Sequence, residues 1–151
     1  MDTSNELILL GGCPASGKST FAKNKLKDYQ IVEFDDWVVN KYNDTLLNST
    51  ALYHKNIDKN FDLFLQYVSS LRGKIVVCDT WTYKKYRLKA IQKLNIKKII
   101  YLLCDLNVCL ERNKNRLLPN ELVITYFFLQ EIPTVNECKT VEIIRNDIYY
   151  Q

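Results

Sequence analysis

Short apolar runs alternate along the chain with longer segments in which apolar residues recur at helical spacing. The short runs predict five strands, over residues 7–11, 31–34, 75–78, 98–104 and 141–144. The longer segments predict helices over residues 18–28, 54–72, 83–94, 108–116 and 120–130. The run at 75–78 has no polar alternation, which is typical of a strand covered on both faces of a parallel sheet. Alternation of this kind predicts an α/β sandwich with right-handed crossovers.

Length and composition favour one globular domain over residues 1–151, because no repeat or linker interrupts 151 residues of which 47% are hydrophobic. The apolar run at residues 7–10 is too short for a signal peptide or a membrane span, so we expect no membrane partner. The five cysteines lack the spacing of a zinc or redox site, and their odd number predicts reduced thiols in a cytoplasmic protein.

A glycine-rich turn follows the first predicted strand and opens the first helix. It reads Gly12, Cys13, Pro14, Ala15, Ser16, Gly17, Lys18, Ser19 and Thr20, and it uses Gly11, Gly12 and Gly17 of the chain's four glycines. Glycines let consecutive amides point at phosphate oxygens, and the helix N-terminus adds partial positive charge. Lys18 is expected on the β- and γ-phosphates and Ser19 on Mg²⁺. The turn predicts binding of ATP or GTP.

Carboxylates follow the next strands at the edge where ligands of α/β sheets bind. Of Asp35 and Asp36, one is expected to accept the proton of an attacking hydroxyl and the other to cap the next helix. Asp79, followed by Thr80, is expected either to orient water on Mg²⁺ or to act as a cap. Asp105 is expected to cap the helix near residue 108.

Trp37 and Trp81 directly follow the two acidic sites. Tryptophan is common in protein cores, but these two lie in stretches that the pattern assigns to polar loops at strand ends. Stacking of a nucleobase and burial in the core both remain open for them.

Two arginines, Arg112 and Arg116, lie four residues apart and are expected on one helical face of a lid at about residues 107–120. Guanidinium groups suit phosphate, so the face is either a phosphate clamp or a solvated surface.

In this order, the phosphate loop, Phe34-Asp35-Asp36-Trp37, Cys78-Asp79-Thr80 and residues 111–116 resemble the kinase domain of phage-type polynucleotide 5′-kinases. They are also similar, less specifically, to small P-loop kinases. The resemblance implies a P-loop NTPase-type three-layer sandwich with a five-stranded parallel sheet of order 2-3-1-4-5. It further implies that Asp35 is the general base and that Arg116 contacts the donor phosphates.

Three positions depart from the family. Val38 stands where the family usually has an arginine that helps to bind the acceptor's phosphate. Trp81 replaces an asparagine in the acceptor wall, and Ala15 replaces a glycine of the phosphate loop, while Gly17 and Lys18 remain.

Basic residues crowd the predicted helix at residues 83–94 and its exit, with Tyr83 and Tyr86 among them. They are Lys84, Lys85, Arg87, Lys89, Lys93, Lys97 and Lys98. The net charge of +4 permits a polyanionic partner. The residues form either a surface for nucleic-acid phosphates or a solvated face opposite a buried stripe of Leu88, Ile91 and Leu94.

These features predict a kinase that uses ATP and Mg²⁺, with Lys18, Asp35 and Arg116 as catalytic residues. The leading acceptor is the 5′-hydroxyl of a polynucleotide or nucleotide, bound by Asp36, Trp37, Asp79, Thr80 and Trp81. A kinase of a small metabolite, nucleoside or modified base is the first alternative. A nucleotide-binding regulator that transfers no phosphate is the second.

Overall fold

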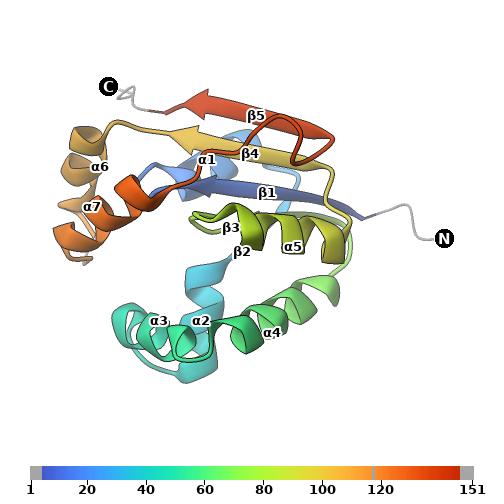
Figure 1. Cartoon of the computed structure of the whole chain (residues 1–151), viewed down its shortest axis with the longest axis horizontal. Coiled ribbons are helices and arrows are strands. Elements are labelled where there is room, and N and C mark those ends of the chain that lie inside the picture. The colour runs from blue at the N-terminus through green and yellow to red at the C-terminus, as the bar shows by residue number, and fades with distance from the viewer. Residues whose placement is uncertain (1–4, 117, 147–151) are drawn as a thin grey trace.

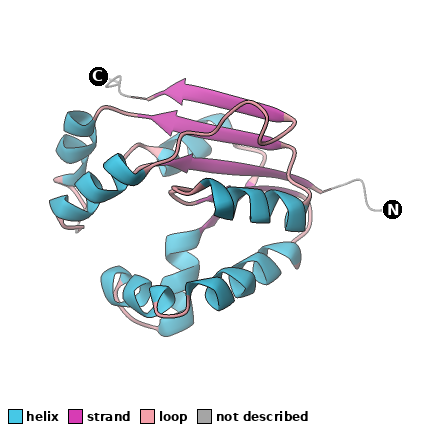
Figure 2. Cartoon of the chain, in the orientation of Figure 1, coloured by secondary structure: helices cyan, strands magenta, loops and turns pink. Residues whose placement is uncertain are grey.

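The computed structural model describes residues 5–116 and 118–146, which form an α/β fold around a five-stranded parallel sheet (Figures 1 and 2). The strands are β1 (Glu6–Gly12), β2 (Gln30–Glu33), β3 (Lys74–Cys78), β4 (Lys98–Leu103) and β5 (Thr140–Arg145). Their order across the sheet is β2-β3-β1-β4-β5, and each neighbouring pair is parallel. The predicted sheet and its order are confirmed.

The helices are α1 (Lys18–Lys25), α2 (Phe34–Tyr42), α3 (Leu46–His54), α4 (Ile57–Ser69), α5 (Lys84–Leu94), α6 (Leu106–Asn113) and α7 (Asn120–Leu129). The sequence analysis expected a helix capped by Asp35 or Asp36 but gave it no bounds, and α2 lies there. It predicted no helix in the place of α3. The single helix predicted over residues 54–72 is wrong at its start, because α3 ends at His54 and α4 begins at Ile57. The Asn60 amide donates to the Tyr53 carbonyl at 3.0 Å and so satisfies one carbonyl at the end of α3.

Alternate residues of each central strand face opposite helical layers, as in a sheet covered on both sides. Ile8 and Leu10 of β1 belong to a buried cluster that includes Ala22 of α1. Leu9 lies between them and belongs to a larger cluster with residues of α2, α4 and α5. Figure 1 shows the same arrangement, with α1 behind the sheet and α5 in front of it.

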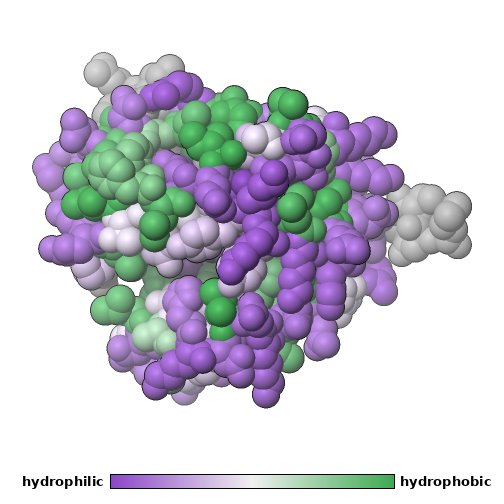
Figure 3. Space-filling model, viewed as in Figure 1, coloured by the Kyte–Doolittle hydropathy of each residue, from purple (hydrophilic) through white to green (hydrophobic). Residues whose placement is uncertain are grey.

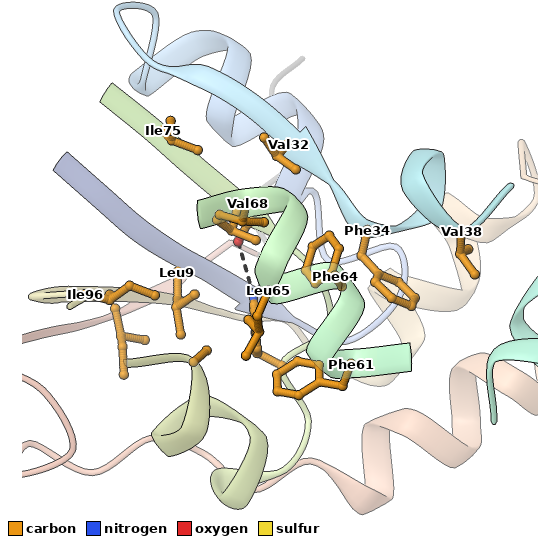
Figure 4. Packing of buried hydrophobic residues seen from close by; sticks show 14 of the residues in the cluster. Leu9, Val32, Phe34, Val38, Phe61, Phe64, Leu65, Val68, Ile75 and Ile96 are labelled. Carbon is orange, nitrogen blue, oxygen red and sulfur yellow. Dashed lines mark hydrogen bonds between the residues drawn. The ribbon is translucent and has the colours of Figure 1, made fainter. Parts of the chain in front are cut away.

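Helix α4 supplies much of the larger core with the apolar face that its spacing predicts. Phe61, Phe64, Leu65 and Val68 are buried, and the ring of Phe64 lies beside that of Phe34 at the start of α2 (Figure 4). The rings of Phe64 and Phe34 meet edge to face with centroids 5.2 Å apart, a geometry that aromatic pairs prefer. This contact ties α4 to the start of α2.

The carboxyl ends of β1 and β3 meet beside each other and position the candidate site. The Gly12 amide donates to the Thr80 carbonyl at 3.2 Å, and the Asp79 amide donates to the Leu10 carbonyl at 3.2 Å. Helices α6 and α7 lie at the same end of the sheet (Figure 1). Within residues 5–116 and 118–146, no helix is long and apolar enough to cross a membrane.

Candidate active site

The loop between β1 and α1 has the backbone geometry that phosphate binding requires. Gly17, at φ +94°, is left-handed and directly precedes α1. A Cβ on Gly12 would lie 2.6 Å from Ser16 Oγ and 2.8 Å from the Leu102 carbonyl oxygen, so a side chain does not fit there. The Ser16 hydroxyl is buried and has no hydrogen-bond partner in the described part of the chain. The loop therefore offers a helix N-terminus and an unused hydroxyl group.

Ala15 adopts a left-handed conformation, with φ +67°. This conformation costs an L-residue other than glycine about 1–2 kcal/mol. Its methyl group is buried and packs with Cys13, Cys109 and Val123. The packing offsets part of the strain, which explains how alanine is accommodated where the resembling family has glycine.

Cys13 of the loop contacts Cys109 of α6, with 3.1 Å between the sulfur atoms. Both are free thiols, as are Cys78, Cys104 and Cys138.

Lys18 lies at the centre of the site's charges. Its Nζ donates to the carbonyl oxygens of Gly12 at 3.0 Å and Cys13 at 3.1 Å. Burial lowers the pKa of Lys18, while the nearby charges of Asp35 and Asp79 raise it and that of Arg116 lowers it. The three predicted catalytic residues are thus brought within electrostatic range of one another.

Two carboxylates face this lysine from different elements. Burial raises the pKa of Asp35, against the opposing effect of Lys18 and Arg116. Burial and then the charge of Asp35 raise the pKa of Asp79 to about 7, although the Thr80 amide donates to it at 2.7 Å. A carboxyl group with a pKa near neutrality is suited to accept and release a proton.

The expectation that Asp35 or Asp36 caps a helix is wrong. Glu33 occupies the N-cap position of α2, and both aspartates lie in its first turn. The first turn of a helix favours negative charge, but burial raises the pKa of both carboxyl groups above its ordinary value.

Glu33 is a site residue that the sequence analysis missed. The Ser19 hydroxyl donates to its Oε1 atom, which places a carboxylate beside the predicted magnesium ligand. The missed signal is its position as the last residue of β2, at the edge of the sheet where ligands bind.

The two arginines of the predicted lid have different surroundings. Arg112 donates from Nη1 to the Ser16 carbonyl at 3.1 Å and from Nη2 to the Asn146 carbonyl at 2.7 Å. Arg116 lies beyond the end of α6 and is exposed, so the prediction of one shared helical face is wrong. Arg112 braces the backbone of the phosphate loop, whereas Arg116 is available to a ligand.

Asp105 occupies the N-cap position of α6, as predicted, but its side chain makes no capping hydrogen bond. Its carboxylate binds Arg145 of β5 at 2.8 Å instead. Its role is structural, as expected.

A cavity of about 470 Å³ opens at the carboxyl end of β3, and Asp79, Thr80 and Trp81 line part of it. Trp81 is 3% exposed, and its Nε1 donates to the Val77 carbonyl at 3.1 Å. Its φ of +46° is unusual for a bulky residue. Backbone strain of this kind is often found at ligand sites.

Asp36 and Trp37 lie apart from this cavity and line a different hollow. The expectation of a polar loop is wrong for Trp37, which belongs to α2. Its ring packs 5.1 Å from that of Phe64 and 6.5 Å from that of Tyr53. The structure therefore does not bring together the five predicted acceptor residues.

The structure of the basic helix α5 differs from both predictions, a surface for nucleic-acid phosphates and a solvated face opposite a buried stripe. Arg87 is completely buried, and its Nε lies 2.9 Å from Glu137 Oε1. Leu88, expected in the buried stripe, is 41% exposed. Lys89 binds Asp62 at 2.8 Å. Arg87 is thus unable to contact a nucleic-acid backbone.

A family model described as an AAA domain matches residues 7–123. The chain belongs to this AAA domain family. The match runs from β1 through the phosphate loop, both carboxylates, Arg112 and Arg116 to the middle of α7. No protein among those with curated functions matches the chain.

Solved structures similar to this AAA domain include small P-loop kinases. A gluconokinase from Sinorhizobium meliloti 1021 has a TM-score of 0.71 at 19% identity, over 93% of this chain and 82% of that one. A shikimate kinase from Bacteroides thetaiotaomicron has a TM-score of 0.61 at 12% identity, over 90% of this chain and 85% of that one. These similarities confirm the P-loop kinase fold. The likeness to polynucleotide kinases stays a prediction.

Proposed function

We propose that this protein is an ATP-dependent kinase that transfers the γ-phosphate to a hydroxyl group of a small molecule. One observation carries the proposal: Asp79, which lines the cavity, lies in the electrostatic field of Lys18 of the phosphate loop. Donor phosphates and an acceptor hydroxyl would therefore meet at the carboxyl ends of β1 and β3, where α/β folds bind ligands.

The loop residues fit a nucleotide triphosphate with Mg²⁺. The helix N-terminus that follows Gly17, the unused Ser16 hydroxyl and the Lys18 ammonium suit phosphate oxygens. Ser19 and Glu33 offer the hard oxygen ligands that Mg²⁺ prefers. No group of three or more His, Cys, Asp or Glu side chains in the described ranges could hold a metal. Mg²⁺ binds few protein groups and keeps phosphate and water ligands.

In the proposed reaction, the acceptor oxygen attacks the γ-phosphorus while the bond to the β,γ-bridging oxygen breaks. ADP leaves with the bonding electrons, and the proton of the hydroxyl passes to a carboxylate, for which Asp35 is the first candidate. Lys18 and Arg116 offset the negative charge on the phosphates. Bound Mg²⁺ would add charge neutralisation at the β- and γ-oxygens.

Two buried residues favour a small acceptor over a polynucleotide. The prediction that the acceptor is a polynucleotide 5′-hydroxyl is supported by the sequence resemblance alone. Val38, where that family has a phosphate-binding arginine, is completely buried. Arg87 is buried as well, and both residues therefore favour a small acceptor.

The test is transfer of labelled γ-phosphate to a panel of hydroxyl compounds: sugars, sugar acids, nucleosides, nucleotides and 5′-hydroxyl oligonucleotides. We expect transfer to at least one small molecule, and its abolition in Lys18→Ala. ATP binding without transfer to any member would instead support the nucleotide-binding regulator.

A further inference from the structure

The cavity beside Asp79 is walled chiefly by aromatic rings. Fifteen described residues line it, and seven of them are Phe, Tyr or Trp. Tyr53 comes from α3, Phe61 from α4 and Tyr126 from α7, and Trp81 follows β3. The molecular surface is hollowed between α7 and the group formed by α3 and α4 (Figure 3). A volume of about 470 Å³ suits a small molecule rather than a polymer.

The rings hold one another in place. Phe61 meets Trp81 with centroids 6.0 Å apart and Tyr86 with centroids 5.1 Å apart, both edge to face. Tyr83 meets Tyr86 in the same manner at 6.3 Å. The cavity is therefore formed in advance, so a ligand loses little affinity to ordering of the walls.

The charges around the cavity disfavour an ionic ligand of either sign. A carboxylate or phosphate would face the half-buried carboxyl group of Asp79. Bidentate recognition of such groups comes from a guanidinium, whereas the ammonium of Lys85 acts only as a point charge. Arg87, the nearby buried arginine, donates to Glu137 and to the Trp81 carbonyl instead. A cation would meet the ammonium of Lys85, which lines the cavity with its Nζ 5.0 Å from the centre of the Tyr86 ring. The lining thus carries one ionisable group of each sign and selects neither an anion nor a cation.

The remaining polar groups of the walls are uncharged. Thr80, Thr82 and Thr125 line the cavity, and the Thr82 hydroxyl donates to the Thr80 hydroxyl at 3.0 Å. Burial lowers the pKa of His54, also in the wall, and so favours the neutral form of this side chain. Such groups suit the ring nitrogens, carbonyls and hydroxyls of a neutral ligand.

We propose that this cavity binds an uncharged planar aromatic alcohol of about nucleoside size, with its ring among the aromatic side chains and its hydroxyl beside Asp79. This substrate class rests on the kinase function proposed above. It separates this chain from enzymes whose acceptor is a sugar acid, since an acidic acceptor would find no arginine among the described residues that line the cavity.

The experiment measures binding and transfer separately. Calorimetry with adenosine, cytidine and benzyl alcohol, in the presence of a non-hydrolysable ATP analogue, gives Kd for each. ADP release with ATP reports transfer. Tyr126→Leu removes one ring from the wall, and Phe128→Leu is its matched control, because Phe128 lies on the same helix but is 73% exposed and lies outside the cavity lining.

We expect Tyr126→Leu to raise the Kd of the tightest-binding compound by about 5- to 100-fold, the usual effect of losing one stacking ring. Phe128→Leu should leave it unchanged, and neither change should alter the Kd of the ATP analogue. If Tyr126→Leu fails to bind the analogue and is therefore misfolded, Tyr83→Leu takes its place. A Kd that neither Tyr126→Leu nor Tyr83→Leu alters would overturn the proposal.

The two proposals fail in different ways. Transfer to gluconate, choline or a 5′-hydroxyl oligonucleotide, with no binding of the three uncharged aromatic compounds, would overturn the substrate class and leave the kinase function standing. Binding of a nucleoside with no ADP release above the rate without acceptor would support the cavity's ligand class and overturn the kinase function.

Discussion

The Arg87 guanidinium and the Glu137 carboxylate form a fork-to-fork ion pair, with 2.9 Å from Nε to Oε1 and 3.2 Å from Nη2 to Oε2. The two side chains are 0% and 1% exposed. The third arm of the same guanidinium donates to the Trp81 carbonyl at 2.6 Å. One buried ion pair thereby joins α5 to the segment before β5 and fixes a residue of the aromatic cavity.

Arg87→Ala should therefore lower the free energy of unfolding by about 3–5 kcal/mol, because it leaves the Glu137 carboxylate buried without its partner. Lys84→Ala, an exposed change on the same helix, is the control and should stay within about 0.5 kcal/mol. Urea denaturation of both variants provides the measurement. Equal effects of the two substitutions would show that the ion pair does not support the fold.

The deficit of Arg87→Ala should depend on pH. Burial raises the pKa of Glu137, but hydrogen bonds from Arg87 and Thr134 outweigh it and leave the pKa below its ordinary value of 4.5. A carboxyl whose pKa is lowered by folding stabilises the protein above its unfolded pKa, and that contribution is lost as pH falls through the folded pKa. The gap in unfolding free energy between wild type and Arg87→Ala should shrink below about pH 4. A gap that stays constant from pH 7 to pH 3 would contradict the assignment.

Glu33→Gln should raise the Mg²⁺ concentration needed for half-maximal transfer by about 10- to 100-fold, the usual effect of removing a group that orients a metal ligand. The reason is that Glu33 accepts the hydrogen bond of Ser19. Glu142→Gln is the matched control, because Glu142 binds Lys98 on β4, at 2.9 Å. A Mg²⁺ titration of both variants decides the matter, and equal midpoints would remove Glu33 from the metal site.

Arg112→Ala should mainly affect the binding of ATP, whereas Arg116→Ala should mainly affect turnover. Arg112 supports the Ser16 carbonyl, so its loss should weaken ATP binding and lower Tm. Exposed Arg116 should mainly lower kcat, since its charge matters most as phosphate charge redistributes. Initial rates over a range of ATP concentrations, with a melting curve for each variant, test both expectations. An Arg116→Ala effect confined to the KM for ATP would reduce Arg116 to a binding residue.

Local sequence signals predicted the strands and the phosphate loop because both depend on neighbouring residues. The apolar run at 75–78 indicates by itself a strand that is buried on both faces. Gly17 adopts a left-handed conformation that its own residue type allows. The order of the strands came from resemblance, since periodicity carries no information on which strands pair.

Two of the errors concern contacts between residues that are distant in sequence, and a third concerns a missing turn signal. Arg87 looked exposed because its partner Glu137 lies 50 residues away. Trp37 looked like a loop residue because α2 begins directly after β2, with no intervening turn signal. Glu33 was hidden inside an apolar strand pattern, and only the folded sheet places it beside Ser19.

The carboxyl group of Asp79 should make the free protein less stable as pH rises. Burial, followed by the charge of Asp35, raises its pKa to about 7 from an ordinary value of 3.8. Between these two values the folded state holds a proton that the unfolded state has released, so the free energy of unfolding falls as pH increases.

Asp79→Asn removes this ionisation while it keeps the size of the side chain. The variant should gain stability over wild type as pH rises from 5 to 8, by more than about 1.4 kcal/mol, which is the equivalent of one pKa unit. Asp105→Asn is the control, because Asp105 is exposed and pairs with Arg145 at the surface. Urea denaturation at both pH values measures the gain, and a difference from wild type that is the same at pH 5 and pH 8 would contradict the raised pKa.

If Asp79→Asn also lowers turnover, Asp79 lowers the stability of the protein but supports its activity, as charged groups in active sites commonly do. Asp35→Asn should then be compared at the same pH values. A loss of about 10²–10⁴ in kcat for Asp35→Asn, against a smaller loss for Asp79→Asn, would identify Asp35 as the general base. The reverse order would assign that role to Asp79.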